Sequence, residues 1–219
     1  MINASIHLRC LSKQFLGKIV IKNFEECFYP GEVIGIIGKN GVGKTTLIKL
    51  ISGLIRPDAG EVLIFSKNNE FFHKDCMLRV GTLLENSRAL YWRLSVWRNF
   101  VYFSGLKGIF GKGVLENAKK ILNLFGLWEL KNVIVETLST GMKQRMAIVS
   151  AICHDPSIIL LDEPTIGLDH DVKQVLVDMI KRFSEEKKTI VVTSHDHNFI
   201  SSVSGKIYKI ENSGLDCVF

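Results

Sequence analysis

Residues 38–45 have the composition and spacing of a loop that binds phosphate. They read Gly-Lys-Asn-Gly-Val-Gly-Lys-Thr, so that glycines at fixed intervals precede a Lys-Thr pair. Glycines are needed in such a loop because a β-carbon would keep the backbone N–H groups away from a phosphate. The pattern is that of a P-loop and predicts binding of a nucleoside triphosphate.

In this loop, Lys44 is expected to reach the β and γ phosphates, Thr45 to bind Mg²⁺ and Thr46 to donate a hydrogen bond to a phosphate oxygen. The alternative is a glycine-rich turn with a surface lysine. The flanking residues favour the P-loop, because an apolar strand-like run at 33–37 precedes it and apolar residues at helical spacing follow it over 45–54.

Two carboxylates follow directly on an apolar, strand-like run at residues 157–161. Charges at the end of a buried strand are costly unless they have a task. Asp162 is expected to hold Mg²⁺ through water, and Glu163 to orient and deprotonate an attacking water. The alternative is that both carboxylates cap the next helix, for which Asp169 is the better candidate.

A histidine stands just beyond another strand-like run, at residues 189–193. A lone histidine is more often structural than catalytic. Beside a phosphate, however, the imidazole of His195 can donate a hydrogen bond to a phosphoryl oxygen or to the attacking water, which makes it a candidate catalytic residue. His197 is expected at the surface without a role.

The elements that must position these residues alternate between strands and helices. Strand-like runs occur at residues 33–37, 62–65, 158–161, 189–193 and 207–210. The run at 207–210 is expected to be the final strand. Between residues 86 and 155 these runs fade, and helical spacing there ends at Gly126, so this stretch is interpreted as a helical insertion. The alternation favours an α/β fold whose ligand site lies at the carboxyl ends of parallel strands.

The composition is that of an ordinary globular chain of 219 residues. Its net charge of +6 contains no long basic block, so a solvated surface is expected rather than a nucleic-acid-binding face. No apolar run reaches the ~20 residues of a membrane span and no secretory signal is visible, which predicts a cytosolic chain unless a partner anchors it. The five scattered cysteines are expected to be reduced and mostly buried.

The peptide Leu-Ser-Thr-Gly-Met-Lys-Gln at 138–144 stands between the P-loop and the acid pair. A Leu-Ser-x-Gly string means little alone. With the P-loop, this peptide, the acid pair, Gly-Leu-Asp at 167–169 and His195 in one order, the chain resembles the ATP-binding cassette (ABC) family of transporter ATPase subunits over essentially its whole length. The peptide matches that family's signature peptide.

The resemblance implies a single nucleotide-binding domain at residues 1–219. Its fold would be a P-loop (RecA-like) sheet core with an N-terminal antiparallel β region, at residues 1–85 and 156–219. A helical subdomain would be inserted at residues 86–155.

Family cassettes pair head to tail around two ATP molecules. In such a pair, Ser139 and Gly141 of one subunit would contact the γ-phosphate of ATP held by Lys44 of the other, and the interface would be isologous. Asn40 and Gly41 would line the near side of that nucleotide. The residues implied to bind ATP are Phe15, Gly38, Asn40, Gly41, Gly43, Lys44, Thr45, Thr46, Ser139, Gly141 and Asp169, the last of them in the loop that communicates between the two sites.

Phe15 occupies the place where the family has an aromatic residue stacked on adenine, and the alternative is a phenylalanine of the core. Two positions of the signature peptide depart from its commonest form, since Thr140 and Met142 stand where the family has glycine and glutamine. This form is similar to cassettes that serve exporters of drugs, lipids or polysaccharides.

Glu85 is a third departure, at a place where the family usually has a glutamine that touches Mg²⁺ and the attacking water. A carboxylate can still bind Mg²⁺, but it adds negative charge near the γ-phosphate and would depend more on the metal. The Mg²⁺ ligands that follow are Thr45, Glu85 and Asp162. The segment 86–100 resembles the part of exporter cassettes that faces the membrane subunit, with Tyr91 or Trp92 in the docking groove and Trp97 packed inside.

The leading interpretation is a Mg²⁺-dependent ATPase subunit, peripheral on the cytoplasmic face of the membrane, with Lys44, Glu163 and His195 as catalytic residues. It would form a homodimer around two ATP and drive a separate transmembrane permease subunit, in export. The alternatives are a soluble non-transport ABC ATPase and an ATP-binding partner cassette of low activity in a heterodimer. A P-loop GTPase or small-molecule kinase is disfavoured because the sequence has no Asn-Lys-x-Asp string and such proteins have no use for the signature peptide. No nucleic-acid partner is expected.

Overall fold

The larger of two sheets is mostly parallel, and the candidate catalytic residues lie at or just beyond the ends of its strands. The computed structural model describes residues 4–68, 78–84, 90–108 and 111–218. The sheet has the order β10-β9-β3-β8-β7-β6, and only β10 runs antiparallel to its neighbour. Its strands are β3 (Val33–Ile37), β6 (Val80–Leu83), β7 (Ile158–Asp162), β8 (Thr189–Thr193), β9 (Lys206–Glu211) and β10 (Gly214–Cys217).

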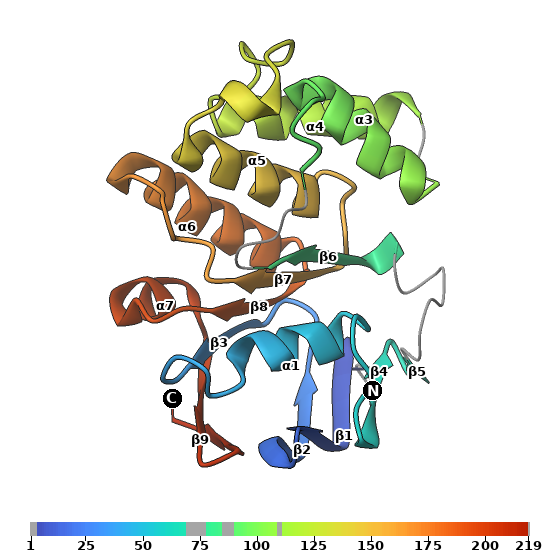
Figure 1. Ribbon diagram of the computed structural model, residues 1–219, viewed down its shortest axis with the longest axis vertical. Coiled ribbons are helices and arrows are strands. Elements are labelled where there is room, and N and C mark those ends of the chain that lie inside the picture. The colour runs from blue at the N-terminus through green and yellow to red at the C-terminus, as the bar shows by residue number, and fades with distance from the viewer. Residues whose placement is uncertain (1–3, 69–77, 85–89, 109–110, 219) are drawn as a thin grey trace.

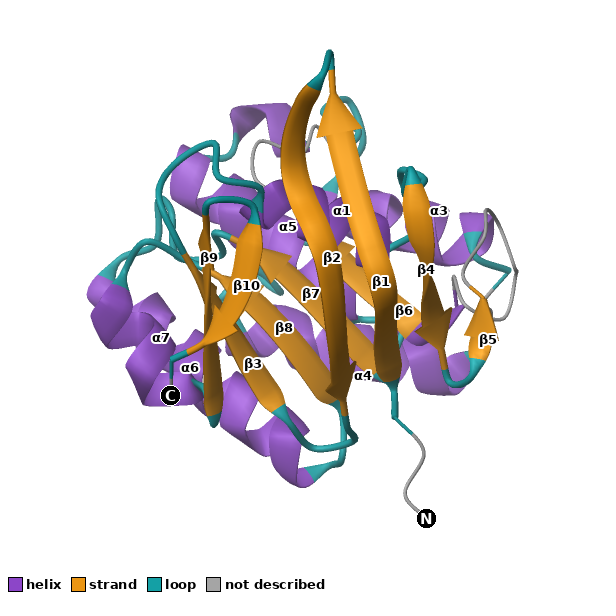
Figure 2. Cartoon of the chain, turned by 90° about the horizontal axis from the view of Figure 1, so that it is seen from below, coloured by secondary structure: helices purple, strands orange, loops and turns teal. Residues whose placement is uncertain are grey.

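The smaller sheet is antiparallel and comes from the N-terminal part of the chain. Its order is β2-β1-β4-β5. The strands are β1 (Ile6–Phe15), β2 (Lys18–Phe28), β4 (Ala59–Ile64) and β5 (Lys67–Asn68). Figure 2 shows β1, β2 and β4 in front of α1 and the parallel strands, so the two sheets face each other with α1 between them.

The helices form layers above and below the parallel sheet. They are α1 (Lys44–Ile51), α3 (Val96–Leu106), α4 (Lys112–Leu124), α5 (Thr140–Ile152), α6 (His170–Glu185) and α7 (His197–Val203). Figure 1 shows α3 and α4 at one end of the molecule and α1 on the opposite side of the sheet, while α5 packs on β6 and α6 packs on β8. A short 3₁₀ turn, Val135–Thr137, leads into α5.

Two hydrophobic cores, one on each face of the parallel sheet, hold these layers together. One core joins α3, α4, α5 and α6 to the sheet through residues such as Phe100, Leu122 and Ile148. The other packs α1 between the two sheets, with Phe28 and Leu47 among its fully buried side chains. Apolar residues of the parallel strands alternate between the two cores, which explains why those strands read as continuous Ile, Val and Leu runs.

The predicted α/β fold class is confirmed, with a parallel sheet core, an N-terminal antiparallel region and helices between β6 and β7. The prediction of a final strand at 207–210 is wrong, because β10 follows β9. Asn212 and Ser213 both have positive φ, of 49° and 63°, and form the two-residue turn of this hairpin. The predicted helix at 45–54 ends earlier, at Ile51, because Gly53 at a φ of 73° terminates it.

The expectation of mostly buried cysteines is also wrong. Of the four described cysteines, Cys153 is buried, Cys27 is half-buried, and Cys10 and Cys217 are exposed. Cys10 turns outward because it lies in an irregular part of β1, at a φ of 48°, where its thiol donates a hydrogen bond to the Glu25 carboxylate. No disulfide joins these four residues.

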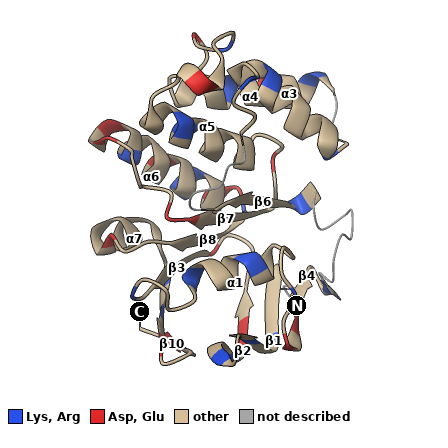
Figure 3. Cartoon of the chain, in the orientation of Figure 1, with Lys and Arg blue, Asp and Glu red and all other residues tan. Residues whose placement is uncertain are grey.

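Lysine and arginine positions are spread over helices and strands and are interspersed with acidic ones, as Figure 3 shows. In the described part of the chain, no helix is both long enough and apolar enough to cross a membrane.

Candidate functional site

The predicted P-loop connects buried β3 to α1, as the sequence pattern requires. Its glycines adopt backbone conformations that other residues avoid, with φ of 151° at Gly38, 74° at Gly41 and 122° at Gly43. A β-carbon at Gly43 would lie 2.8 Å from the Val20 side chain on β2, whereas one at Gly41 would have no described heavy atom within 4 Å. The loop is therefore held against the antiparallel sheet on one side and open on the other.

The first turn of α1 presents its backbone N–H groups to the open side of the loop. Gly43 is its N-cap and has no side chain to bond to them, and the first turn carries no acidic residue. By contrast, Ser95, Ser139, Asp169 and Asp196 cap α3, α5, α6 and α7 with side-chain oxygens. An uncapped helix N-terminus with a positive dipole end suits an anion such as a phosphate.

Lys44 is folded back under the loop and is only 7% exposed. Its Nζ donates hydrogen bonds to the Gly38 carbonyl oxygen at 2.9 Å and to that of Lys39 at 3.4 Å, and lies 3.7 Å from Glu163 Oε1. The buried ammonium group thus has polar partners that an incoming phosphate can replace. The alternative of a surface lysine on a glycine-rich turn is wrong.

The Asp162 carboxylate is completely buried and is held from two sides. Thr45 Oγ1 on α1 donates a hydrogen bond to Asp162 Oδ2 at 2.7 Å. Thr193 Oγ1 on the neighbouring strand donates one to Oδ1 at 2.6 Å. Asp162 is the last residue of β7, so the carboxylate belongs to the strand end and not to a helix cap.

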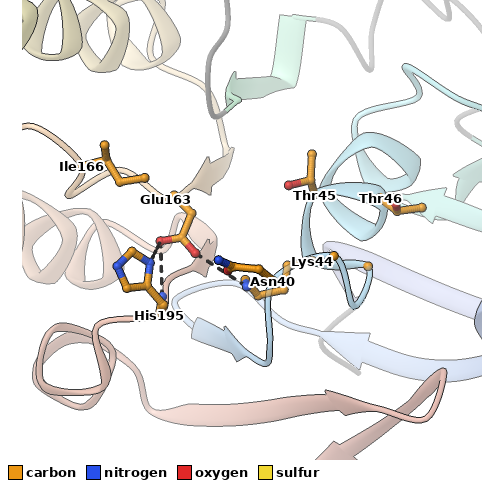
Figure 4. A pocket seen from close by; sticks show the side chains of 9 residues that line it. Asn40, Lys44, Thr45, Thr46, Glu163, Ile166 and His195 are labelled. Carbon is orange, nitrogen blue, oxygen red and sulfur yellow. Dashed lines mark hydrogen bonds and ion pairs between the residues drawn. The ribbon is translucent and has the colours of Figure 1, made fainter.

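The Glu163 carboxylate is 4% exposed and lies between a lysine and a histidine. Its Oε1 faces Lys44 Nζ, while Oε2 accepts hydrogen bonds from the His195 backbone N–H at 3.2 Å and from the imidazole Nδ1 at 3.0 Å. Because a carboxylate only accepts, the Nδ1 atom carries the proton in this hydrogen bond. Figure 4 shows the interactions of Glu163 with Lys44 and His195, and the Nε2 edge of His195 turned away from Glu163.

One cavity of about 500 Å³ brings most of the predicted residues together. It lies among the P-loop, the end of β7 and the end of β8 (Figure 4). Its lining residues are Asn40, Gly41, Gly43, Lys44, Thr45, Thr46, Glu163, Ile166 and His195. Ile166 was not predicted, because a single apolar residue in a loop carries no sequence pattern of its own. The arrangement combines anion-binding N–H groups, a cation, a carboxylate base and an imidazole, which suits hydrolysis of a phosphate ester or anhydride.

The signature-peptide residues do not line this cavity. Ser139 is exposed and caps α5, since its Oγ accepts a hydrogen bond from the Met142 N–H at 3.2 Å. Gly141 packs against the loop that follows Glu163, where a β-carbon would lie 2.9 Å from the Gly167 carbonyl oxygen. Glycine at position 141 is therefore required by the chain's own packing.

Asp169 caps α6, as its position predicts, and also forms an ion pair with α5. Its Oδ1 accepts a hydrogen bond from the Val172 N–H at 2.9 Å, and its Oδ2 lies 2.6 Å from Arg145 Nη2. The hydrogen bond from the Val172 N–H, followed by the Arg145 charge, holds the pKa of Asp169 below its ordinary value. The loop beside the cavity and the helix that begins with the signature peptide are thus directly linked.

Phe15 lies at the end of β1 and is 46% exposed, so its interpretation as a core residue is wrong. Lys13 Nζ sits 5.3 Å from the centre of its ring. An exposed ring face is available for stacking, although Phe15 does not line the cavity. Glu85 and its predicted metal contact lie outside the described residues.

The aromatic residues near α3 divide as predicted. Tyr91 and Trp92 are about half exposed, whereas Trp97 packs against the core beside Phe100. The Tyr91 ring packs on Tyr102, with centroids 4.6 Å apart. Val101, Tyr102 and Leu106 on α3 are exposed as well.

The donor set beside the cavity fits Mg²⁺. Thr45 and Asp162 offer hard oxygen atoms next to an anion-binding loop, which is how Mg²⁺ is usually held together with substrate phosphates and water. Among the described residues, no group of three or more His, Cys, Asp or Glu side chains could enclose a metal ion. A site completed by phosphate oxygens is therefore the arrangement that these residues suit.

Comparison with known sequences gives one consistent result. The model of the ABC transporter family matches residues 21–166. The ABC transporter ATP-binding protein NatA of Bacillus subtilis is 32% identical over 182 residues, which cover 83% of this chain and 74% of that protein. A putative ABC transporter ATP-binding protein of Clostridium tetani is 36% identical over 200 residues, which are 91% of this chain but only 45% of that protein.

Solved structures agree with this match. The dimeric structure of a bacterial ABC transporter cassette superimposes with a TM-score of 0.86 at 26% identity, covering 96% of each chain. The ATP-binding subunit of another ABC transporter superimposes with a TM-score of 0.89 at 22% identity, covering 96% of this chain and 87% of that one, which shows a shared fold.

Proposed function

Since the chain belongs to the ABC transporter family, we propose that it binds and hydrolyses ATP and drives a separate transmembrane permease subunit. The observation that carries the proposal is the convergence of Lys44, Glu163 and His195 on one cavity beside the uncapped N-terminus of α1. We further propose the division inferred from the sequence, with a core at 1–85 and 156–219 and a helical subdomain at 86–155.

The phosphates of ATP would bind in the P-loop. The N–H groups at the start of α1 and the Lys44 ammonium group supply positive potential there, while Asn40 and Gly41 form the open side. Thr46, which lines the same cavity, would donate to a phosphate oxygen. The exposed ring of Phe15 would stack on the adenine.

Thr45 and Asp162 would hold Mg²⁺, with Glu85 as a further ligand, and the ion would neutralise charge on the β and γ phosphates. Glu163 would accept the proton of the attacking water. Its carboxylate is suited to this because His195 fixes one oxygen while the other faces the cavity near Lys44. With Nδ1–H bound to Glu163, a hydrogen bond from His195 to a phosphate would use Nε2–H of the protonated imidazole.

Two copies would close head to tail, so that Ser139 and Gly141 of each complete the cavity of the other. Support comes from the exposure of the α5 N-terminus, where Ser139 has no place in the cavity of its own chain. The first-turn N–H groups of α5 other than that of Met142, which Ser139 caps, can then face the partner's γ-phosphate. The Arg145–Asp169 ion pair would connect this helix to the loop beside the chain's own nucleotide.

The exposed aromatic residues Tyr91, Trp92 and Tyr102 would receive the permease at the cytoplasmic face of the membrane. The Thr140 and Met142 form of the signature peptide supports export. We expect Trp92→Ala to uncouple ATPase activity from transport without changing ATP affinity. Loss of ATP affinity in that variant would place Trp92 in the nucleotide site instead.

The experiment that tests this function is trapping of the ATP-bound dimer. Glu163→Gln keeps an oxygen that accepts from His195 but removes the base, so with Mg²⁺ and ATP the variant should accumulate as a dimer on size exclusion with light scattering. Glu163→Gln without ATP, and Lys44→Ala/Glu163→Gln with ATP, are the matched controls and should stay monomeric. A strictly monomeric Glu163→Gln protein with Mg²⁺ and ATP would contradict the proposal.

Two alternatives correspond to other outcomes. A soluble non-transport ABC ATPase would form the same dimer but would not co-purify with a membrane protein. A low-activity partner cassette would dimerise only when a second, related cassette is present.

A further inference from the structure

Thr193 touches both members of the acid pair through a single hydroxyl group. It is the last residue of β8, is completely buried, and stands beside Asp162 in the parallel pairing of β7 with β8. Its Oγ1 donates to Asp162 Oδ1 at 2.6 Å and accepts from the Glu163 backbone N–H at 3.1 Å. A hydroxyl has one proton, so these two hydrogen bonds use it as donor and as acceptor at the same time.

The first of these hydrogen bonds sets the rotation of the Asp162 carboxylate. With Oδ1 held by Thr193, Oδ2 is the oxygen that accepts from Thr45 Oγ1 at 2.7 Å. Thr45 and Asp162 are the two described residues proposed above to hold Mg²⁺. The hydroxyl of Thr193 would therefore fix which carboxylate oxygen is available to the ion.

The second hydrogen bond supports an unfavourable backbone conformation at Glu163. That residue has a φ of 49°, in the left-handed region that non-glycine residues seldom adopt. Its N–H is held by Thr193 twice, by Oγ1 and by the carbonyl oxygen, each at 3.1 Å. This backbone turn directs the Glu163 side chain toward Lys44 and His195.

We propose that Thr193 is a positioning residue for ATP hydrolysis, which orients the Asp162 carboxylate for Mg²⁺ and the Glu163 backbone for its role as base. The proposal rests on the function proposed above. His195, two residues farther along the same strand end, holds the Glu163 carboxylate. One strand end thus fixes both acidic side chains, although Thr193 itself does not line the cavity.

The test compares three variants of the 219-residue chain. Thr193→Val has nearly the same shape but neither donor nor acceptor, whereas Thr193→Ser keeps both. Thr189→Val is the matched control, because Thr189 lies at the other end of β8, is equally buried, and also loses two hydrogen bonds, to Ser5 Oγ and the Tyr29 carbonyl oxygen. Thr193→Ala serves if valine beside the carboxylate prevents folding.

We expect Thr193→Val to lower kcat about ten- to hundredfold and to raise the Mg²⁺ concentration for half-maximal activity. Thr193→Ser should behave nearly as the wild type, and Thr189→Val should lower the thermal unfolding temperature without changing the Mg²⁺ titration. A readout independent of turnover is ATP binding measured by calorimetry in the Glu163→Gln background, where Thr193→Val should weaken binding with Mg²⁺ but not without it.

Three results would overturn the inference. They are an unchanged kcat and Mg²⁺ titration in Thr193→Val, an equal defect in Thr193→Ser, or ATP binding whose response to Mg²⁺ is unaffected. Failure of the proposed function itself would give different results. The wild-type protein would then not hydrolyse ATP, and the Glu163→Gln variant would not form a dimer with Mg²⁺ and ATP.

Discussion

Acid should destabilise this protein through one buried histidine, His154. The side chain is 7% exposed at the end of α5, and its Nε2 lies 2.8 Å from Lys107 Nζ, which also donates to the Val80 carbonyl oxygen. Burial, and secondarily the Lys107 charge, lowers the pKa of His154 from an ordinary value of 6.5 to about 3. In the folded protein the imidazole therefore stays neutral, accepting a hydrogen bond from the lysine.

The pKa values set the direction and the size of the effect. Between pH 6.5 and about 3 the unfolded chain binds a proton at His154 that the folded chain does not, so stability is lost as the pH falls through this window. Relative to about pH 7.5, the free energy of unfolding at about pH 5.5 is lower by roughly 1.4 kcal/mol. This figure is RT times the logarithm of the factor by which the unfolded state's proton-binding polynomial for His154 grows between the two pH values. A folded-state pKa about one unit higher would leave this figure almost unchanged, since it would still lie well below pH 5.5.

The assay is urea unfolding of wild type and His154→Gln at the two pH values. Glutamine keeps an acceptor for Lys107 but does not titrate. Between the two pH values, the variant should therefore lose about 1.4 kcal/mol less of its free energy of unfolding than the wild type does. Lys107→Met should leave the wild-type loss almost unchanged, because burial, the larger cause, keeps the pKa of His154 well below pH 5.5. Equal losses in wild type and His154→Gln would refute the reasoning.

Two further predictions concern Gly141 and Glu85. Gly141→Ala should destabilise the protein by about 1–2 kcal/mol in urea unfolding, because the new β-carbon would lie 2.9 Å from the Gly167 carbonyl oxygen. The control Gly113→Ala, in α4 with open space around it, should stabilise the protein by up to about 1 kcal/mol. Equal effects at the two sites would show that packing is not the cause. Glu85→Gln should retain ATPase activity and shift its Mg²⁺ dependence, and an unchanged Mg²⁺ titration would remove Glu85 from the site.

The P-loop and the acid pair could be predicted from sequence because each is made of residues close together in the chain. The P-loop spacing locates Lys44, and an apolar strand that ends in two acids locates Asp162 and Glu163. A charged pair at a buried strand end is an unusual pattern, so few other interpretations compete with it.

Features that depend on contacts between distant segments could not be predicted. Thr193 is an ordinary strand residue in the sequence, and only the pairing of β8 with β7 brings its hydroxyl to Asp162. Likewise, the exposure of Phe15 and the requirement for Gly141 follow from how the antiparallel sheet and α5 pack. The strand β10 was missed because its turn is short and none of its four residues is buried.

The central claim, that each active site is shared between two chains, is tested most directly by mixing two inactive variants. Lys44→Ala removes the cation of a chain's own cavity. Ser139→Asp keeps an oxygen that caps α5 but places a negative charge toward the partner's triphosphate, and Ser139→Asn is its uncharged control with the same capping ability.

Each of the two variants should be inactive alone, while the Ser139→Asn protein should retain activity. Mixed in equal amounts, Lys44→Ala and Ser139→Asp should recover about a quarter of wild-type ATPase activity, because half of the dimers then contain one intact site out of two. A mixture no more active than its components would contradict the account, since it would mean that the signature peptide serves the nucleotide of its own chain.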